Sequence, residues 1–256
     1  MGAVKIKMYA EILSPLPMTS REDGERVLSL WESCLPNCLP DKVGNWEPID
    51  QVFALDRKDD MLNLWRWPFF AVKKKPKMHA GFFMRKGKML QHASWILDFA
   101  YGDVNSNEIA QFLRQAATLF EADLGCLTLL TNTEIEVGRA NGTVRPLNKK
   151  GTRFSFSISS QMIQKCIPDV HWITIFGTPY LKMFGKEKLL SAPAHKAEAL
   201  NDDTIIVQLT PSLEDMRGDP SGFAEARARL KAFLGETAFF DAERAGECKR
   251  PEFIWK

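Results

Sequence analysis

The sequence predicts an α+β fold in which two similar lobes, each an antiparallel sheet with a helix on it, pack as one compact unit. Three observations support this class: short strand-like runs, helical periodicity between them, and a strand–loop–helix pattern that recurs about 110 residues later. The composition, with 45% apolar and 26% charged residues, 16 Gly and 14 Pro among 256, is typical of a globular protein. Fibrous, disordered and disulfide-scaffold classes are excluded.

The chain is expected to begin with a strand over residues 4–13. A helix should start at Thr19–Glu22, where a hydroxyl followed three residues later by a carboxylate can satisfy free backbone amides. This helix should end before Pro36, because proline disfavours helical geometry in the residue that precedes it.

Strand-like runs over 78–85 and 89–99 are joined by Lys86–Gly87–Lys88, a short glycine-containing connection typical of a hairpin. Apolar residues then recur at helical spacing from Ile109 to Phe120, which predicts a helix with one buried face that ends at Gly125. A helix of this kind should lie on a sheet.

The second half repeats this order of elements. A β-branched strand over 204–210 is followed by Asp219–Pro220, a typical helix N-cap and first-turn proline, and by an amphipathic helix that ends at Gly235. The repeat aligns two pairs of segments: Ser94–Ile96 with Thr204–Ile206, and Leu124–Gly125 with Leu234–Gly235.

The domain organisation follows from this pattern. We expect an N-terminal α+β lobe over 1–140, a connection over 141–152 and a C-terminal α+β lobe over 153–256. The connection has no apolar run and contains Gly, Pro and basic residues, which is typical of a solvated segment.

Charge and cysteine usage give a general setting. Lysine and arginine exceed aspartate and glutamate by only two, so the total charge does not favour nucleic acid or membrane as a partner. The five cysteines, odd in number and irregularly spaced, are expected to be free thiols in a reducing compartment. No signal peptide or membrane-spanning run is recognisable, so a cytoplasmic location is expected.

Familiar catalytic and cofactor motifs do not fit the sequence. The segment 81–88 has five residues between its glycines, where a P-loop has four, and Met89 stands where the P-loop hydroxyl should be. Cys34 and Cys38 lack a second pair of zinc ligands, and no strained turn activates Ser191 or Cys166 as a nucleophile. We therefore expect no catalytic residue, metal or cofactor.

A magnesium-dependent nuclease is one alternative. Pro40–Asp41 followed by Asp56–Arg57–Lys58 has the order of a site in which two carboxylates hold the metal and a lysine orients water. Such acid-x-lysine triplets are frequent in a chain rich in both residue types.

A nucleic-acid-binding module is a second alternative. Seven basic residues without an intervening acid surround Phe82 and Phe83 in the hairpin 73–88, and such a surface can hold phosphates and stack bases. The basic residues are Lys73, Lys74, Lys75, Lys77, Arg85, Lys86 and Lys88. Lysines at a sheet edge also prevent edge-to-edge pairing, which is a purely structural explanation.

A group of carboxylates brackets the strand predicted at 204–210. Its members are Asp202, Asp203, Glu214 and Asp215, with Asp219 at the helix start. These carboxylates either meet a basic surface of a partner or cap the following helix, and the sequence supports both interpretations equally.

The second half resembles a known family in a series of short segments. They are His171–Tyr180, Phe184–Gly185, Leu189–Ala194, Ile205–Thr210 and Ala238–Phe240. They are similar to the immunity proteins of bacterial polymorphic-toxin and type VI secretion systems, in the group paired with toxins that carry a restriction-endonuclease-like nuclease domain. The similarity covers chiefly residues 166–240.

The resemblance implies a function without catalysis. An immunity protein, or antitoxin, binds a cognate nuclease toxin encoded nearby and occludes its substrate cleft or a surface needed for assembly, as a nuclease inhibitor in bacterial competition. Because a nuclease cleft is basic, we expect the partner to contact Asp202, Asp203, Glu214 and Asp215, with Trp65 and Trp67 as aromatic anchors. Direct contact with nucleic acid or membrane is not expected.

Overall fold

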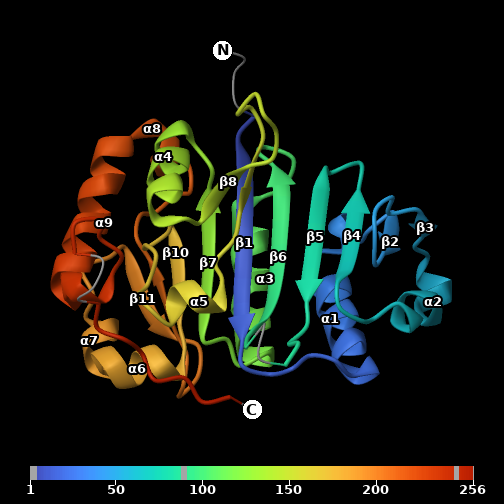
Figure 1. Ribbon diagram of the computed structural model, residues 1–256, viewed down its shortest axis with the longest axis horizontal. Coiled ribbons are helices and arrows are strands. Elements are labelled where there is room, and N and C mark those ends of the chain that lie inside the picture. Colours follow the sequence, from blue (N-terminus) through green and yellow to red (C-terminus); the bar gives the residue numbers. More distant parts are fainter. Residues whose placement is uncertain (1–4, 88–90, 245–247, 256) are drawn as a thin grey trace.

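The computed structural model describes residues 5–87, 91–244 and 248–255. Its main feature is a ten-stranded sheet in the order β11-β12-β10-β7-β1-β6-β5-β4-β2-β3, in which the paired neighbours run antiparallel (Figure 1). A separate antiparallel pair joins β8 and β9. The predicted α+β class is confirmed.

The strands are β1 Lys7–Ser14, β2 Lys42–Gly44, β3 Gln51–Val52, β4 Phe69–Lys73, β5 Met78–Phe83, β6 Ala93–Ala100, β7 Leu124–Leu129, β8 Val144–Pro146, β9 Phe154–Phe156, β10 Ile173–Phe176, β11 Lys196–Ala199 and β12 Ile205–Gln208. The helices are α1 Arg21–Cys34, α2 Lys58–Asn63, α3 Ser106–Leu119, α4 Asn132–Asn141, α5 Ser160–Ile163, α6 Thr178–Phe184, α7 Lys186–Leu190, α8 Asp215–Gly218 and α9 Pro220–Leu234. Three 3-10 turns complete the described elements: η1 Pro36–Cys38, η2 Leu55–Arg57 and η3 Glu236–Ala238.

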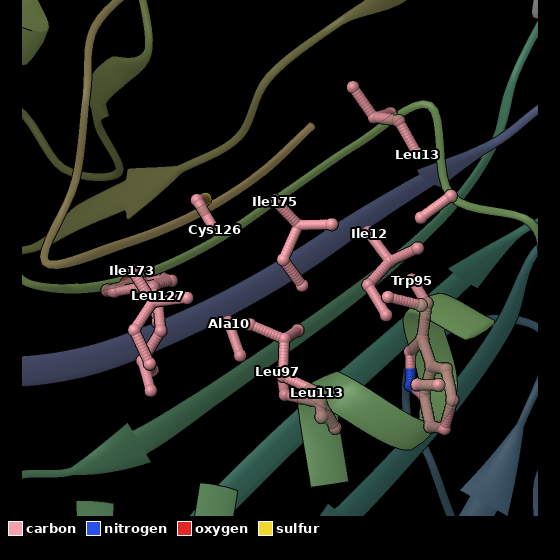
Figure 2. Packing of buried hydrophobic residues seen from close by; sticks show 14 of the residues in the cluster. Ala10, Ile12, Leu13, Trp95, Leu97, Leu113, Cys126, Leu127, Ile173 and Ile175 are labelled. Atoms are coloured by element: carbon pink, nitrogen blue, oxygen red, sulfur yellow. The ribbon is translucent and has the colours of Figure 1, made fainter. Parts of the chain in front are cut away.

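One face of the sheet carries α1 and α3. Side chains alternate along a strand, so Ala10 and Ile12 of β1 share a face with the residues paired to them on β6, Leu97 and Trp95. Figure 2 shows Trp95 and Leu97 gathered with Leu113 of α3 on that face. Rings from α1, α3 and the sheet contact one another there, which makes this layer the main aromatic core.

The opposite face of β1 is covered by the chain around β9. The Tyr9 hydroxyl donates to the Phe154 carbonyl at 3.0 Å, and the Ile158 amide donates to Glu11 Oε2 at 2.8 Å. Both strand side chains are buried. These two hydrogen bonds fix residues 154–158 across the centre of the sheet.

Strand β7 was not predicted, and it lies at the centre of the sheet between β1 and β10. Gly125, expected to end the preceding helix, sits within β7 opposite Ile12 and Ile175. A Cβ at this position would come within 3.3 Å of Ile175, so the glycine allows close packing on the sheet face and does not end the helix.

Helix α3 ends at Leu119, and Glu121, just beyond its C-cap, adopts a left-handed conformation with φ of 48°. The Ala122 amide donates to the Ala117 carbonyl at 2.9 Å, and the Glu121 amide donates to Thr118 at 3.4 Å. This is a Schellman motif, in which a non-glycine residue occupies the position that glycine usually takes.

Several local predictions are confirmed. Helix α1 follows a capping box formed by Ser20 and Asp23, one residue later than expected, and ends at Cys34 before Pro36. Helix α9 begins with Asp219 as N-cap, whose side chain accepts from the Gly222 amide at 3.0 Å, and Gly235 follows its last residue.

Other predictions differ from the structure. Strands β5 and β6 pair antiparallel, but the connection between them, 84–92, is longer than the predicted turn. Lys88 of that predicted turn and the following Met89 lie outside the described residues. The internal repeat is not confirmed, because α3 leads into a central strand whereas α9 leads into η3. The division of the chain into lobes over 1–140 and 153–256 stays a prediction. In the sheet, β7 of the first segment pairs with β10 of the second.

All five cysteines are free thiols, as predicted. Within the described ranges, none of the helices has the length and apolar character needed to cross a membrane.

Candidate partner-binding surfaces

The four predicted partner-binding carboxylates do not form one surface. Asp202 and Asp203 lie in the turn between β11 and β12, whereas Glu214 and Asp215 lie at the start of α8, beyond the other end of β12. Because β12 separates the two pairs along its length, a single small contact cannot include both.

Most of these carboxylates have local partners. Asp202 forms an ion pair with Lys186 at 3.3 Å, Glu214 accepts from the Tyr101 hydroxyl, and Asp215 accepts from the Ser212 amide at 3.0 Å. Glu214 and Asp215 therefore hold the α8 loop in place, whereas the N-cap of α9 is Asp219. Their contact with a partner stays a prediction.

The two predicted aromatic anchors lie near the core. Trp65 is only 6% exposed, packs on Phe69 and Phe82, and donates its indole N–H to the Met18 carbonyl at 3.2 Å. Its ring is not available to a partner in this conformation, because α1 approaches it so closely that a Cβ at Gly24 would lie 2.8 Å from it. Trp67 is half-buried, with the Lys86 ammonium 4.1 Å from its ring centroid.

Asp203 lines an acidic cleft. The cleft has a volume of about 290 Å³ and lies at the end of the sheet where β1 ends and β7 and β12 begin. Four carboxylates and no lysine or arginine are found among its described lining residues: Glu121, Asp123, Asp203 and Glu252, together with Pro15, Ala122, Thr178, Pro179, Asn201, Thr204 and Ile254.

The carboxylates of the cleft come from three separate parts of the chain. One is the turn after α3, one is the β11–β12 turn, and the third is the C-terminal segment 248–255. Buried His92 joins the turn after α3 to the C-terminal segment. Its Nε2 lies 3.0 Å from Asp123 Oδ2, and its ring centroid lies 5.0 and 4.6 Å from those of Phe253 and Trp255.

The start of α6 packs tightly against the same turn. The Gly177 amide donates to the Asp123 carbonyl at 2.9 Å, and a Cβ on Gly177 would lie 2.0 Å from the Ala122 carbonyl oxygen. Only glycine permits this approach, because the obstructing atom belongs to the backbone.

Gly177→Ala is therefore expected to lower the free energy of unfolding by about 1–3 kcal/mol, since the α3–β7 turn must shift. Gly218→Ala is the matched control, because nothing lies within 4 Å of the added methyl group. Urea denaturation of the two variants compares them directly. Equal stability of both variants would show that the turn yields without cost.

The basic hairpin is divided in the structure. Lys74 and Lys75 lie in the β4–β5 turn, whereas Arg85 and Lys86 follow the opposite end of β5. Phe82 is buried in the core, and Phe83 is half-buried. The described basic residues of this hairpin therefore form two separate groups, and only one of the two interleaved rings is partly accessible.

One acid and the lysine of the predicted nuclease site have other partners. Asp41 accepts from the Lys74 amide at 2.7 Å, and Lys58 forms an ion pair with Glu32 of α1 at 2.7 Å. Among the residues that the structure places, no three or more His, Cys, Asp or Glu side chains are grouped closely enough to hold a metal ion.

The buried cysteines are poorly suited to nucleophilic chemistry. Burial raises the pKa of Cys38 to about 11 and that of Cys166 to about 12, with neighbouring Cys248 contributing at Cys166. A reactive thiol needs an environment that stabilises the thiolate, and these environments do the opposite.

Comparison with known proteins finds a structural relative. No family model and no curated protein matches this chain. Among solved structures, the chain is similar to the Pseudomonas aeruginosa T6SS protein PA0821, with a TM-score of 0.54 and 15% identity, over 98% of this chain and 80% of that chain. The chain thus shares its fold with a protein of a type VI secretion system.

Proposed function

We propose that this protein binds and neutralises a nuclease toxin of a type VI secretion system, and that it performs no catalysis of its own. The observation that carries the proposal is the acidic cleft, whose lining offers carboxylates from three parts of the chain. The fold shared with a T6SS protein supports the secretion-system context, and the resemblance of residues 166–240 supports the immunity role.

The chemistry of a nuclease suits such a cleft. A nuclease needs lysine or arginine side chains to hold the phosphate backbone of its substrate. A basic side chain inserted into the cleft would form charge-assisted hydrogen bonds with its carboxylates, and these bonds are stronger than neutral ones. The inserted side chain is then withdrawn from the substrate, and the bound protein covers the surface around it.

Cleft variants test this proposal against the product of the adjacent toxin gene. The double change Asp203→Asn with Glu252→Gln is expected to weaken binding by about tenfold or more, because truncated charge pairs at an interface cost ~2 kcal/mol or more. Calorimetric titration or surface plasmon resonance measures the change in Kd.

Asp202→Asn is the matched control. Asp202 is the neighbouring carboxylate, but its side chain is fully exposed and pairs with Lys186 outside the cleft lining. If the cleft receives the toxin, this variant should bind as the wild type does. Equal losses from Asp202 and Asp203 would indicate a diffuse charge effect, and no loss from the double variant would exclude the cleft.

A further inference from the structure

Three exposed apolar side chains lie in the segment at the outer edge of the sheet, and neither the fold nor the cleft explains them. Trp46, Val52 and Leu55 are 70%, 58% and 45% exposed, and Trp46 is the most exposed large apolar side chain in the described chain. All three come from residues 46–55, which form the β2–β3 turn, the outermost strand and the start of η2 at the right of Figure 1. We call these three residues the edge patch.

The base of the edge patch is held rigidly. Asn45, directly before Trp46, is buried and donates its side-chain amide to the carbonyls of Leu64, Arg66 and Pro68 at 2.9, 3.2 and 2.6 Å. The Phe53 amide donates to the Asp41 carbonyl at 3.0 Å. An exposed tryptophan on a fixed backbone loses little conformational freedom on binding, which is the property of an interface anchor.

The charged residues within segment 46–56 are all acidic and unpaired, while Lys42 lies opposite Val52 in the β2–β3 ladder and Arg57 follows the segment. Glu47, Asp50 and Asp56 are exposed and form no ion pair or side-chain hydrogen bond with the described residues. By contrast, the nearby carboxylates of Asp59 and Asp60 pair with Arg21 and Arg57. The apolar side chains therefore lie beside three free negative charges.

We infer that the edge patch is a docking surface for a basic surface of a partner protein. The partner covers Trp46, and its basic side chains pair with the three free carboxylates. This inference rests on the proposed function, and it assigns to the toxin a second contact outside the acidic cleft. An apolar centre with a charged rim is the usual anatomy of a protein interface. Nucleic acid does not suit the patch, because its phosphates would meet carboxylates.

Trp46→Ala tests the inference in the full chain with the toxin encoded by the adjacent gene. Hot-spot tryptophans usually change Kd by about thirtyfold or more when truncated. We expect a loss of this size, mainly as faster dissociation, with unchanged circular dichroism and thermal unfolding because the ring is exposed. Leu147→Ala is the matched control, since Leu147 is a 55% exposed apolar residue near β8, and its Kd should equal that of the wild type.

The charge component is tested by the triple variant Glu47→Gln, Asp50→Asn, Asp56→Asn. Rim charges act chiefly on the association rate. We expect slower association and a weaker dependence of that rate on salt, with dissociation changed less than in Trp46→Ala.

The possible outcomes separate the two proposals. A wild-type complex whose Kd is unchanged by Trp46→Ala overturns the edge patch and leaves the proposed function standing. Losses in Trp46→Ala with none in the cleft variants support the patch and exclude the cleft. The absence of any wild-type complex overturns the proposed function and, with it, this inference.

Discussion

Arg227→Ala is expected to lower the free energy of unfolding by about 3–5 kcal/mol, the largest effect we predict for a single substitution. Arg227 of α9 donates to both carboxylate oxygens of Glu134 of α4 at 2.8 Å, and lies 3.3 Å from Asp169 in the loop before β10. All three residues are buried. Removal of the guanidinium leaves two carboxylates without their shared cation.

The pKa values of the two carboxyls of this network are shifted in opposite directions: burial raises that of Glu134, although the charge of Arg227 partly offsets it. Burial by itself would raise the pKa of Asp169, but the charges of Arg227 and Lys231 outweigh it and lower the pKa below its usual value. In Arg227→Ala, Asp169 keeps the ion pair with Lys231 at 3.3 Å and the hydrogen bond from the Val170 amide at 2.8 Å, but loses the guanidinium.

Arg229→Ala on the same helix is the control for Arg227→Ala. Arg229 is exposed and reaches Glu225 only at 4.0 Å, so its removal should change stability by less than about 0.5 kcal/mol. Urea denaturation at pH 7 measures both variants. Similar small losses would mean that the buried network contributes nothing beyond a surface ion pair.

Glu11→Gln is expected to make the protein more stable by a few kcal/mol at pH 8 and above, while changing little near pH 5. Burial raises the pKa of the Glu11 carboxyl to about 8, although hydrogen bonds from Ile158 and Ser94 partly offset this. Glutamine keeps an oxygen to accept from the Ile158 amide and carries no charge. It therefore removes the cost of an ionised carboxylate at the centre of the sheet.

The direction in which the Glu11 contribution to stability changes with pH follows from the protons bound in the folded and unfolded states. Between the ordinary pKa of 4.5 and the folded value of about 8, the folded state holds a proton that the unfolded state has lost. The free energy of unfolding contributed by Glu11 therefore falls as pH rises through this window, at about 1.4 kcal/mol per pH unit, and is constant outside it.

In Glu11→Gln, the titration of His171 makes the free energy of unfolding change with pH in the opposite direction. Burial lowers its pKa to about 4 from 6.5, so its neutral form is favoured in the folded state and its contribution grows as pH rises between these values. In Glu11→Gln, stability should rise from pH 4 to 6.5 and then level off. In the wild type the contributions of Glu11 and His171 cancel between pH 4.5 and 6.5, so stability is expected to fall only from pH 6.5 to 8. A variant whose stability still falls from pH 6.5 to 8 would show that Glu11 is not the group responsible.

Local sequence signals predicted the elements that have their own start and stop residues. Asp219–Pro220 and Gly235 set the bounds of α9, and the α1 cap was misplaced by one residue. Strand β7 was missed because Gly125 had the properties of a helix stop. The reason for that glycine is its contact with Ile175, about fifty residues further along the chain, which spacing does not reveal.

The candidate site was predicted in part. Asp203 was recognised as an exposed acid in a loop, but the cleft also needs Glu121, Asp123 and Glu252 from distant segments, which only the fold brings together. Tryptophans were harder to assign. The placement of Gly24 makes Trp65 a core residue, whereas Trp46 is followed by Glu47–Pro48, a local sequence sign of exposure.

Inhibition of the purified toxin tests most directly whether this protein acts by covering a macromolecule. The cognate nuclease toxin that the proposed function expects to be encoded nearby is assayed on DNA and RNA with increasing amounts of this chain, and the chain is also assayed without the toxin. We predict that cleavage stops at an equimolar ratio and that the chain alone cleaves neither substrate. Full nuclease activity in the presence of excess chain, or turnover by the chain itself, would contradict the proposal.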